Sequence, residues 1–239
     1  MNSPTKRPSA ASPSTATSRR PGKAGFAAAL VLAVLALSAC GSKPRQPDWL
    51  VNADGAQERF ERAYLQGKDR VATSEFTRFR TEVASTAQPG LVARAELTRC
   101  AVQVASLDFS PCAGFEPLRR DAPEAERAYA DFLEGKATPA QAKLLPEDYR
   151  AIAGGEGGAG ALKKIKAPLP RVIAAGVLLR MEKADPEVLQ VAADTSSEQG
   201  WRRAVMAWLG AQAMRAEKAG AMEEAARLRR RMELAAQER

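Results

Sequence analysis

Residues 93–107 read ARAELTRCAVQVASL, and their apolar side chains recur at helical spacing. The stripe runs through Ala93, Leu97, Cys100, Val104 and Leu107, which are spaced four, three, four and three residues apart. This period predicts an amphipathic helix that turns one face towards a core. Ser110-Pro111 follows and should end the helix, because proline lacks the backbone N–H that a helix interior needs.

Similar stripes fill the chain on both sides of this segment. The clearest combines Ala72, Phe76, Phe79 and Val83, and no convincing strand pattern interrupts the series. The other expected helices are 57–66, one from Asp121-Ala122-Pro123-Glu124 through Phe132, one from Thr138, 146–153, 172–181, one from Asp185, 196–220 and 221–235. Helices of this length joined by short turns predict an all-α fold of antiparallel helix hairpins, arranged as an array or a bundle.

Several helix starts carry capping signatures. Asp121 and Thr138 are followed by Pro123 and Pro139, and each has a Glu or Gln three residues later, at Glu124 and Gln141. Asp185, directly before Pro186, is also predicted to cap the helix that follows it. Ser196 with Gln199 is predicted to cap the helix that presents Trp201, Val205, Trp208 and Gln212 on one side. The aromatic residues are expected in the core, namely Tyr64, Tyr129, Trp201 and Trp208. A solvated helix face is expected to carry Arg227, Arg229, Arg230 and Arg231. Contact of these arginines with an acidic partner or with lipid head groups is the alternative.

The folded part is expected to contain two helical halves, which form either one domain or two closely packed units. An N-terminal half spans residues 56–153, a glycine-rich linker spans 154–160, and a C-terminal half spans 161–239. The linker formally contains G-x-G-x-x-G, but a dinucleotide site requires a preceding strand, and a helix end precedes it here. A flexible connector is therefore predicted.

The first 39 residues have the layout of a secretory signal. Five basic residues and no acidic ones lie in this segment, and an apolar run from Phe26 to Ala39 ends it, broken only by Ser38. The run is too short for a membrane-spanning helix, which needs about 20 apolar residues. Removing residues 1–39 leaves 31 basic against 28 acidic side chains, a net charge of +3 instead of +8, so attraction to nucleic acid is not expected.

The end of this run, Leu37-Ser38-Ala39-Cys40, resembles the lipobox of bacterial lipoproteins. The resemblance implies cleavage before Cys40, a diacylglycerol on its sulfur and a further acyl chain on its new amine. Gly41 instead of aspartate points to the outer membrane, with the protein facing the periplasm. Residues 40–55, which contain Pro44 and Pro47, are then expected to be a tether between the lipid and the domain. A simple secretory signal stays open as the alternative.

Two cysteines remain after Cys40, namely Cys100 and Cys112. The bacterial envelope outside the cytoplasm is oxidising, and two cysteines allow one pairing, so a structural disulfide is predicted. A redox-active pair would favour a C-x-x-C spacing, and the spacing here is much longer.

The chain contains no histidine, which excludes Ser-His-Asp and Cys-His catalysis and most catalytic zinc sites. Neither a metal site nor a cofactor is expected. Chemistry that uses carboxylates alone stays possible. Glu75 and Glu198 have serine neighbours that superficially resemble the catalytic region of lytic transglycosylases, but the order is reversed, and both are expected to be solvated helix residues.

The segment 201–236 resembles a tetratricopeptide repeat. Its matching features are Trp208-Leu209-Gly210, the turn at Gly220, and Glu224-Ala225 in the second helix. The interval from Gly210 to Gly220 is about three residues longer than in the repeat, and no second copy follows at the 34-residue period. The resemblance implies a helical scaffold that binds a peptide or a partner protein on its concave face.

Together these features predict a non-catalytic adaptor or assembly scaffold of the cell envelope, anchored through lipid on Cys40 and serving secretion, pilus or envelope biogenesis. Its protein partner and the binding surface cannot be named from the sequence. A peptidoglycan-binding module or carboxylate-dependent cell-wall enzyme is the first alternative, and a purely structural envelope protein is the second.

Overall fold

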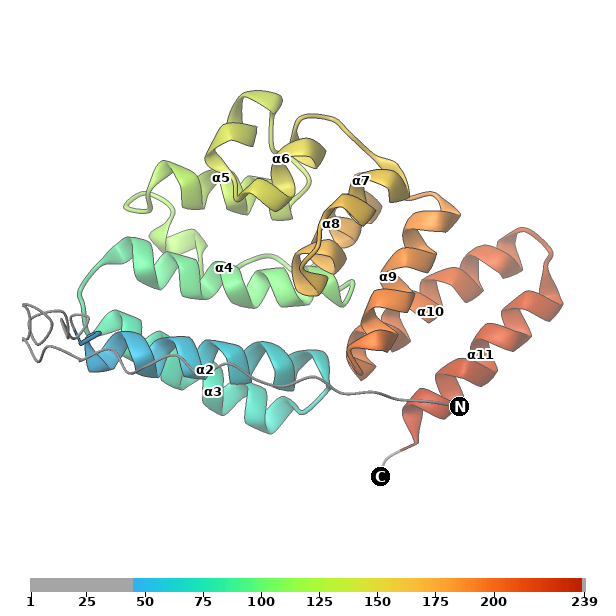
Figure 1. Cartoon of the computed structure of the whole chain (residues 1–239), viewed down its shortest axis with the longest axis horizontal. Helices are drawn as coiled ribbons and strands as arrows, with labels where there is room; N and C mark the ends of the chain where they lie inside the picture. The colour runs from blue at the N-terminus through green and yellow to red at the C-terminus, as the bar shows by residue number, and fades with distance from the viewer. Residues whose placement is uncertain (1–44, 238–239) are drawn as a thin grey trace, which may run out of the picture. The chain divides into compact units, whose positions relative to one another are not determined.

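The computed structural model describes residues 45–237, and this part of the chain is helical without a strand (Figure 1). The prediction of an all-α fold is confirmed. The signal segment 1–39 and Cys40 lie outside the described residues. The helices are α2 (Asp48–Leu65), α3 (Asp69–Ala84), α4 (Pro89–Ala105), α5 (Glu124–Leu133), α6 (Glu147–Ala153), α7 (Gly158–Lys164), α8 (Pro168–Arg180), α9 (Pro186–Glu198), α10 (Arg202–Lys218) and α11 (Met222–Ala236), with 3-10 turns η1 (Glu116–Leu118) and η2 (Pro139–Leu144).

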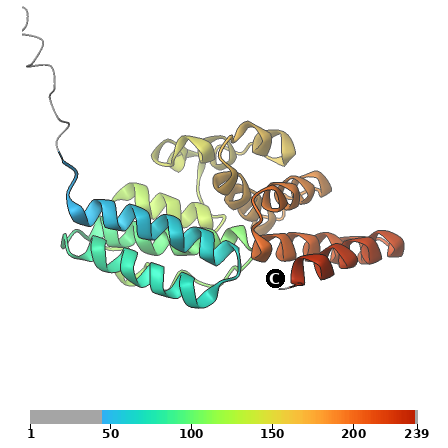
Figure 2. The same cartoon turned by 60° about the horizontal axis from the view of Figure 1, so that its bottom comes forward.

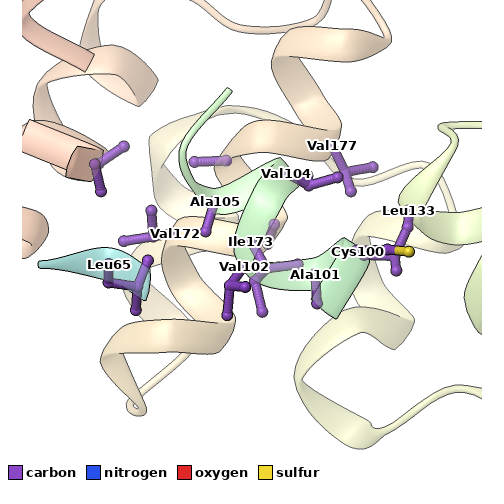
Figure 3. Packing of buried hydrophobic residues seen from close by; sticks show 14 of the residues in the cluster. Leu65, Cys100, Ala101, Val102, Val104, Ala105, Leu133, Val172, Ile173 and Val177 are labelled. Atoms are coloured by element: carbon purple, nitrogen blue, oxygen red, sulfur yellow. The ribbon is translucent and has the colours of Figure 1, made fainter. Parts of the chain in front are cut away.

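Helix α4 is surrounded by other elements, since α2, α3, α5, α8 and η1 all contact it. The predicted stripe is buried from Ala93 to Val104, but Ala95, Ala101 and Val102 on other faces are buried too. Such all-round burial identifies a central helix rather than an amphipathic surface helix. Figure 3 shows Val102 and Ala101 of α4 among apolar side chains that come from several other helices.

Helix α8 is the second helix that is buried on all sides, because every residue from Val172 to Leu178 is inaccessible to solvent. It crosses α4 with its backbone in direct contact. A Cβ atom at Gly176 would lie 2.4 Å from the Val104 carbonyl oxygen, so this position accepts no side chain. Val104 and Val177 lie next to each other at the crossing in Figure 3.

The hairpin of α2 and α3 covers another side of α4 (Figure 2). Helix α2 begins at Asp48, and Ala53 and Ala56 are buried, so the prediction that residues 40–55 form a tether is wrong from Asp48 onwards. Pro47, which the sequence places in the tether, is the N-cap of this helix.

The two predicted halves pack together, and the described residues from Gln46 onwards form one compact unit. Helices α4, α5 and α6, from the first half, all contact α8 from the second. The glycine-rich linker is shorter than predicted, because α7 begins at Gly158 and packs against α8 and α9.

The predicted caps have mixed outcomes. Asp185 caps α9 by accepting a hydrogen bond from the Val188 backbone N–H at 2.8 Å, and the Thr138 N–H donates to Gln141 Oε1 at 2.8 Å as expected, although a 3-10 turn follows. Asp121 is not a cap, because α5 starts after Pro123. Ser196 lies inside α9 and donates its hydroxyl to the Ala192 carbonyl.

The C-terminal hairpin of α10 and α11 is present as predicted, and Ala225 and Leu228 of α11 are buried. Helix α10 begins at Arg202, and Trp201 and Trp208 are core residues as expected. The Trp208 indole N–H donates to the Ala105 carbonyl at 3.0 Å, which fastens α10 to the end of α4. The arginine face of α11 is mainly exposed.

No helix among the described residues is both long and apolar enough to cross a membrane.

The crossing of α4 and α8 gives a direct stability test. Replacing Gly176→Ala forces a methyl group into the Val104 carbonyl, and overpacking of this kind lowers the free energy of unfolding by roughly 1–3 kcal/mol. The measurement is urea unfolding followed by far-ultraviolet circular dichroism.

The matched control is Gly160→Ala in α7, where no atom lies within 4 Å of the added Cβ. This variant should be neutral or more stable by roughly 0.5–1 kcal/mol, since alanine is the better helix former. Equal effects of the two substitutions would contradict the close crossing.

Candidate functional site

A groove runs between α3 and α4, with α2 forming its floor. Its volume is about 430 Å³. The lining residues are Phe60, Tyr64, Asp69, Ala72, Thr73, Phe76, Thr77, Arg80, Thr81, Glu96, Arg99 and Gln103.

The groove is elongated because it follows two antiparallel helices. Asp69 and Gln103 line it towards one end, whereas Thr81 and Glu96 line it towards the other. The α3 residues from 69 to 81 rise by about 18 Å along the helix axis. A fully extended peptide of about five residues spans this length.

Aromatic rings lie along the groove, although Phe60 and Phe76 are only 2% and 8% exposed and add little accessible surface. Phe60 and Phe76 pack with their centroids 5.1 Å apart, and Tyr64 lies 6.1 Å from Phe60. The Arg99 guanidinium lies 4.7 Å from the Phe76 ring centroid, in a cation–π contact. Tyr64, predicted as a core residue, is half-buried and lines the groove.

A buried carboxylate holds two arginines at one end. Glu96 is 3% exposed, and its Oε1 accepts a hydrogen bond from Arg80 Nε at 2.7 Å. Its Oε2 lies 2.6 Å from a terminal nitrogen of Arg99, an ion pair whose angle is not that of a hydrogen bond. Two guanidinium groups therefore share one carboxylate, which leaves one positive charge in excess.

The acidic residue at the opposite end is already neutralised. Asp69 forms an ion pair with Arg203 of α10. Arg203 also donates from Nε to the Tyr64 carbonyl at 2.8 Å, and its guanidinium lies 4.5 Å from the Tyr64 ring centroid. The excess positive charge of the groove thus stays at the Arg80 and Arg99 end.

The predicted disulfide joins Cys100 of α4 to Cys112, with the Cα atoms 5.7 Å apart. It holds the following loop against α4, where a Cβ at Gly114 would lie 2.1 Å from Glu96 Oε2 and 2.4 Å from an Arg99 nitrogen. The absence of a side chain at Gly114 lets the loop cover the buried ion pair. The disulfide therefore holds a loop next to Glu96 and Arg99 at the charged end of the groove.

A second cavity, of about 620 Å³, lies among α4, α5, α6 and α8. It is mainly apolar and includes Leu145, Tyr129 and Tyr149, whose rings stack 5.6 Å apart. Burial raises the pKa of Tyr129 to about 12 and that of Tyr149 well above its usual value. A charged pair lies at its edge, where Arg94 contacts the buried Glu126 at 2.6 Å.

The two carboxylates considered for catalysis lie on different helices. Glu198 is the last residue of α9 and is exposed, as expected. Glu75 is not fully solvated as expected, because it is half-buried and forms an ion pair with Arg59 at 3.0 Å. Neither residue lines the groove.

Glu61 of α2 is a carboxylate with a raised pKa that the sequence pattern does not single out. Burial raises its pKa, although Gln57 donates a hydrogen bond to its Oε1 at 2.8 Å. It lines neither the groove nor the second cavity. Among the described residues, no group of three metal-ligating side chains is close enough to hold a metal ion.

No protein-family model, curated protein or solved structure matches this chain.

The disulfide predicts a redox-dependent stability. Reduction with dithiothreitol should lower the free energy of unfolding by roughly 3 kcal/mol, because a loop of this size then regains its freedom in the unfolded chain. Urea unfolding with and without the reductant measures the change. The Cys100→Ser/Cys112→Ser variant should not respond to the reductant, and an unchanged midpoint for the wild-type protein would contradict a structural bond.

The tyrosines predict a loss of stability in alkali. An unfolded tyrosine has a pKa of about 10, and the raised pKa values of Tyr129 and Tyr149 mean that the folded state keeps their protons more tightly. The contribution of Tyr129 is therefore complete below pH 10 and is lost as the pH rises from 10 to about 12, and the contribution of Tyr149 likewise begins to be lost above pH 10. Thermal melts at pH 9 and 11.5 should show a smaller decrease for Tyr149→Phe than for wild type, and an equal decrease would disprove this origin.

Proposed function

We propose that this protein is a lipid-anchored, non-catalytic adaptor of the bacterial envelope that receives a segment of a partner protein in the groove between α3 and α4. The groove itself is the observation that carries the proposal. It is long enough for an extended peptide segment, it includes the half-buried ring of Tyr64, and it has partly exposed arginines at one end.

Ion pairs between the helices that form the groove favour this use. Arg59 of α2 pairs with Glu75 of α3, and Arg80 of α3 pairs with Glu96 of α4. An ion pair therefore joins α2 to α3, and another joins α3 to α4. A preformed site costs little ordering when a partner binds, and more of the contact energy then appears as affinity.

The anchor proposal rests on the lipobox-like segment that ends at Cys40. Since α2 begins at Asp48, at most seven residues separate the lipidated cysteine from the folded domain. At about 3.3 Å per residue they span at most about 23 Å. We therefore place the adaptor close to the membrane surface, where it would bind a partner that is itself near the membrane.

A carboxylate-dependent cell-wall enzyme is the second candidate, and the raised pKa of Glu61 is the observation in its favour. Burial raises the pKa of this carboxyl group above that of a free glutamate, and a carboxyl group with a raised pKa can act as a general acid. Incubation of the full-length protein with purified sacculi tests this candidate. Release of fragments that stops in Glu61→Gln would replace the adaptor proposal.

A photo-crosslinking amino acid in cells tests the adaptor proposal. One version carries it at Thr77, which lines the groove, and the control carries it at the exposed Ser74 on the same helix, outside the groove. The Thr77 version should capture a reproducible envelope protein, identified by mass spectrometry, that the Ser74 version does not capture.

The same capture should disappear in Cys40→Ala, because that variant cannot be lipidated at this position. Capture at neither position, or equal capture at both, would contradict a partner site in the groove.

A further inference from the structure

We propose that the partner segment is an extended acidic peptide with apolar residues beside its carboxylates, and that Arg80 and Arg99 bind one of these carboxylates. The inference rests on the proposed adaptor function and specifies the chemistry of its partner. Charge, preorganisation, apolar surface and backbone hydrogen bonding each support it.

The charge at one end of the groove selects an anion. Arg80 and Arg99 share the single carboxylate of Glu96, whereas Asp69 at the far end is occupied by Arg203. An incoming carboxylate would complete the charge balance at the arginine end. A basic segment would instead meet two guanidinium groups, and repulsion between like charges excludes such partners.

Both arginines keep hydrogen-bond donors for a ligand. The Arg80 side chain is 47% exposed and contacts Glu96 through Nε, and the Arg99 side chain is 36% exposed. A guanidinium carries five N–H donors in a planar fork that matches a carboxylate. A peptide carboxylate can therefore be added without displacing Glu96.

The guanidinium of Arg99 is also held in position before any ligand arrives. It lies over the Phe76 ring, and the Gly114 backbone of the disulfide-linked loop lies behind it. Fixing a long side chain in this way reduces the ordering cost of each new hydrogen bond.

The rest of the groove matches an extended backbone with apolar side chains. The apolar surface of the groove that a peptide can reach includes the half-buried ring of Tyr64, because Phe60 and Phe76 are only 2% and 8% exposed. On the α3 side, Thr77 and Thr81 donate their hydroxyl protons to the carbonyls one helical turn earlier, at 2.9 and 2.8 Å. Their oxygens can then only accept, and backbone N–H groups of an extended peptide are suitable donors.

Individually synthesised eight-residue peptides provide the probe. Each carries two Glu and two Leu or Phe residues in different orders, and each is matched by versions with Gln or Lys in place of Glu. Binding to the full-length protein in detergent is measured by fluorescence anisotropy at 50 and 300 mM salt. We expect the best acidic peptides to bind about tenfold more tightly than their Gln versions, which corresponds to about 1.4 kcal/mol. Their affinity should fall at the higher salt concentration.

The variants assign this preference to the groove. Arg80→Gln should weaken the best acidic peptide about tenfold, whereas Arg78→Gln should change it by less than about twofold. Arg78 is an exposed residue of the same helix, outside the groove, and its replacement removes the same charge.

A second variant guards against a folding defect in Arg80→Gln. Thr77→Glu places a negative charge in the groove at an exposed helix position, and it should abolish binding of the acidic peptides while the thermal melt stays unchanged.

The remaining outcomes overturn the inference. The inference is wrong if the Gln or Lys versions bind as tightly as the acidic peptides or more tightly, or if Arg78→Gln loses as much peptide affinity as Arg80→Gln. It is also wrong if the protein binds a single-stranded oligonucleotide more tightly than the peptides, or binds no peptide at up to 100-fold above the protein concentration. If the inference fails in any of these ways while Thr77 still captures a partner in cells, the adaptor proposal stands with a different partner chemistry. If Thr77 captures nothing, the adaptor proposal fails as well.

Discussion

The backbone contact between α8 and α4 is the constraint on which the rest of the structure depends. At Gly176 the two helices are so close that a methyl group would overlap the Val104 carbonyl, and both helices are buried on all sides around this point. The N-terminal hairpin packs on the α4 side of this contact, and α9 packs on the α8 side. Helix α10 then reaches back to α4 through the Trp208 indole and to α2 through Arg203. Since the chain closes on itself in this way, the two regions that the sequence divides at the glycine-rich segment form one folded unit.

The groove is a consequence of the same packing. Helix α4 keeps Glu96 on its α3 side, where burial would be costly for a lone carboxylate. Arg80 and Arg99 compensate the charge of Glu96, the disulfide-linked loop covers it through Gly114, and the guanidinium groups stay partly in solvent. The two ion pairs of Glu96 with Arg80 and Arg99 thereby also leave positive charge at the end of the groove. Structure and proposed recognition depend here on the same three side chains.

Local patterns were sufficient to predict the helical class and most helix positions, because periodicity depends on neighbouring residues alone. The stripe through Phe76 and the cap at Asp185 are examples. The disulfide followed from the number of cysteines and the expected oxidising compartment. The errors arose where tertiary packing decides. Pro47 precedes a helix whose residues Ala53 and Ala56 are buried by packing. Ser196 lies inside α9, where its hydroxyl donates to the Ala192 carbonyl. The groove was not predictable, because its width depends on the distance between α3 and α4. The residue pattern within each helix gives no information about that distance. Lipidation at Cys40 remains a prediction from the sequence.

Native-state hydrogen exchange tests the central claim, that residues 46–239 are one cooperative unit built on the contact of α4 and α8. The amides to follow are those of the buried residues Val102, Val104 and Ala105 of α4 and Ala174 to Val177 of α8. The account predicts that both sets exchange only through global unfolding, with the same free energy and the same dependence on denaturant. Exchange of α8 through a separate opening of lower free energy, while α4 stays protected, would contradict it.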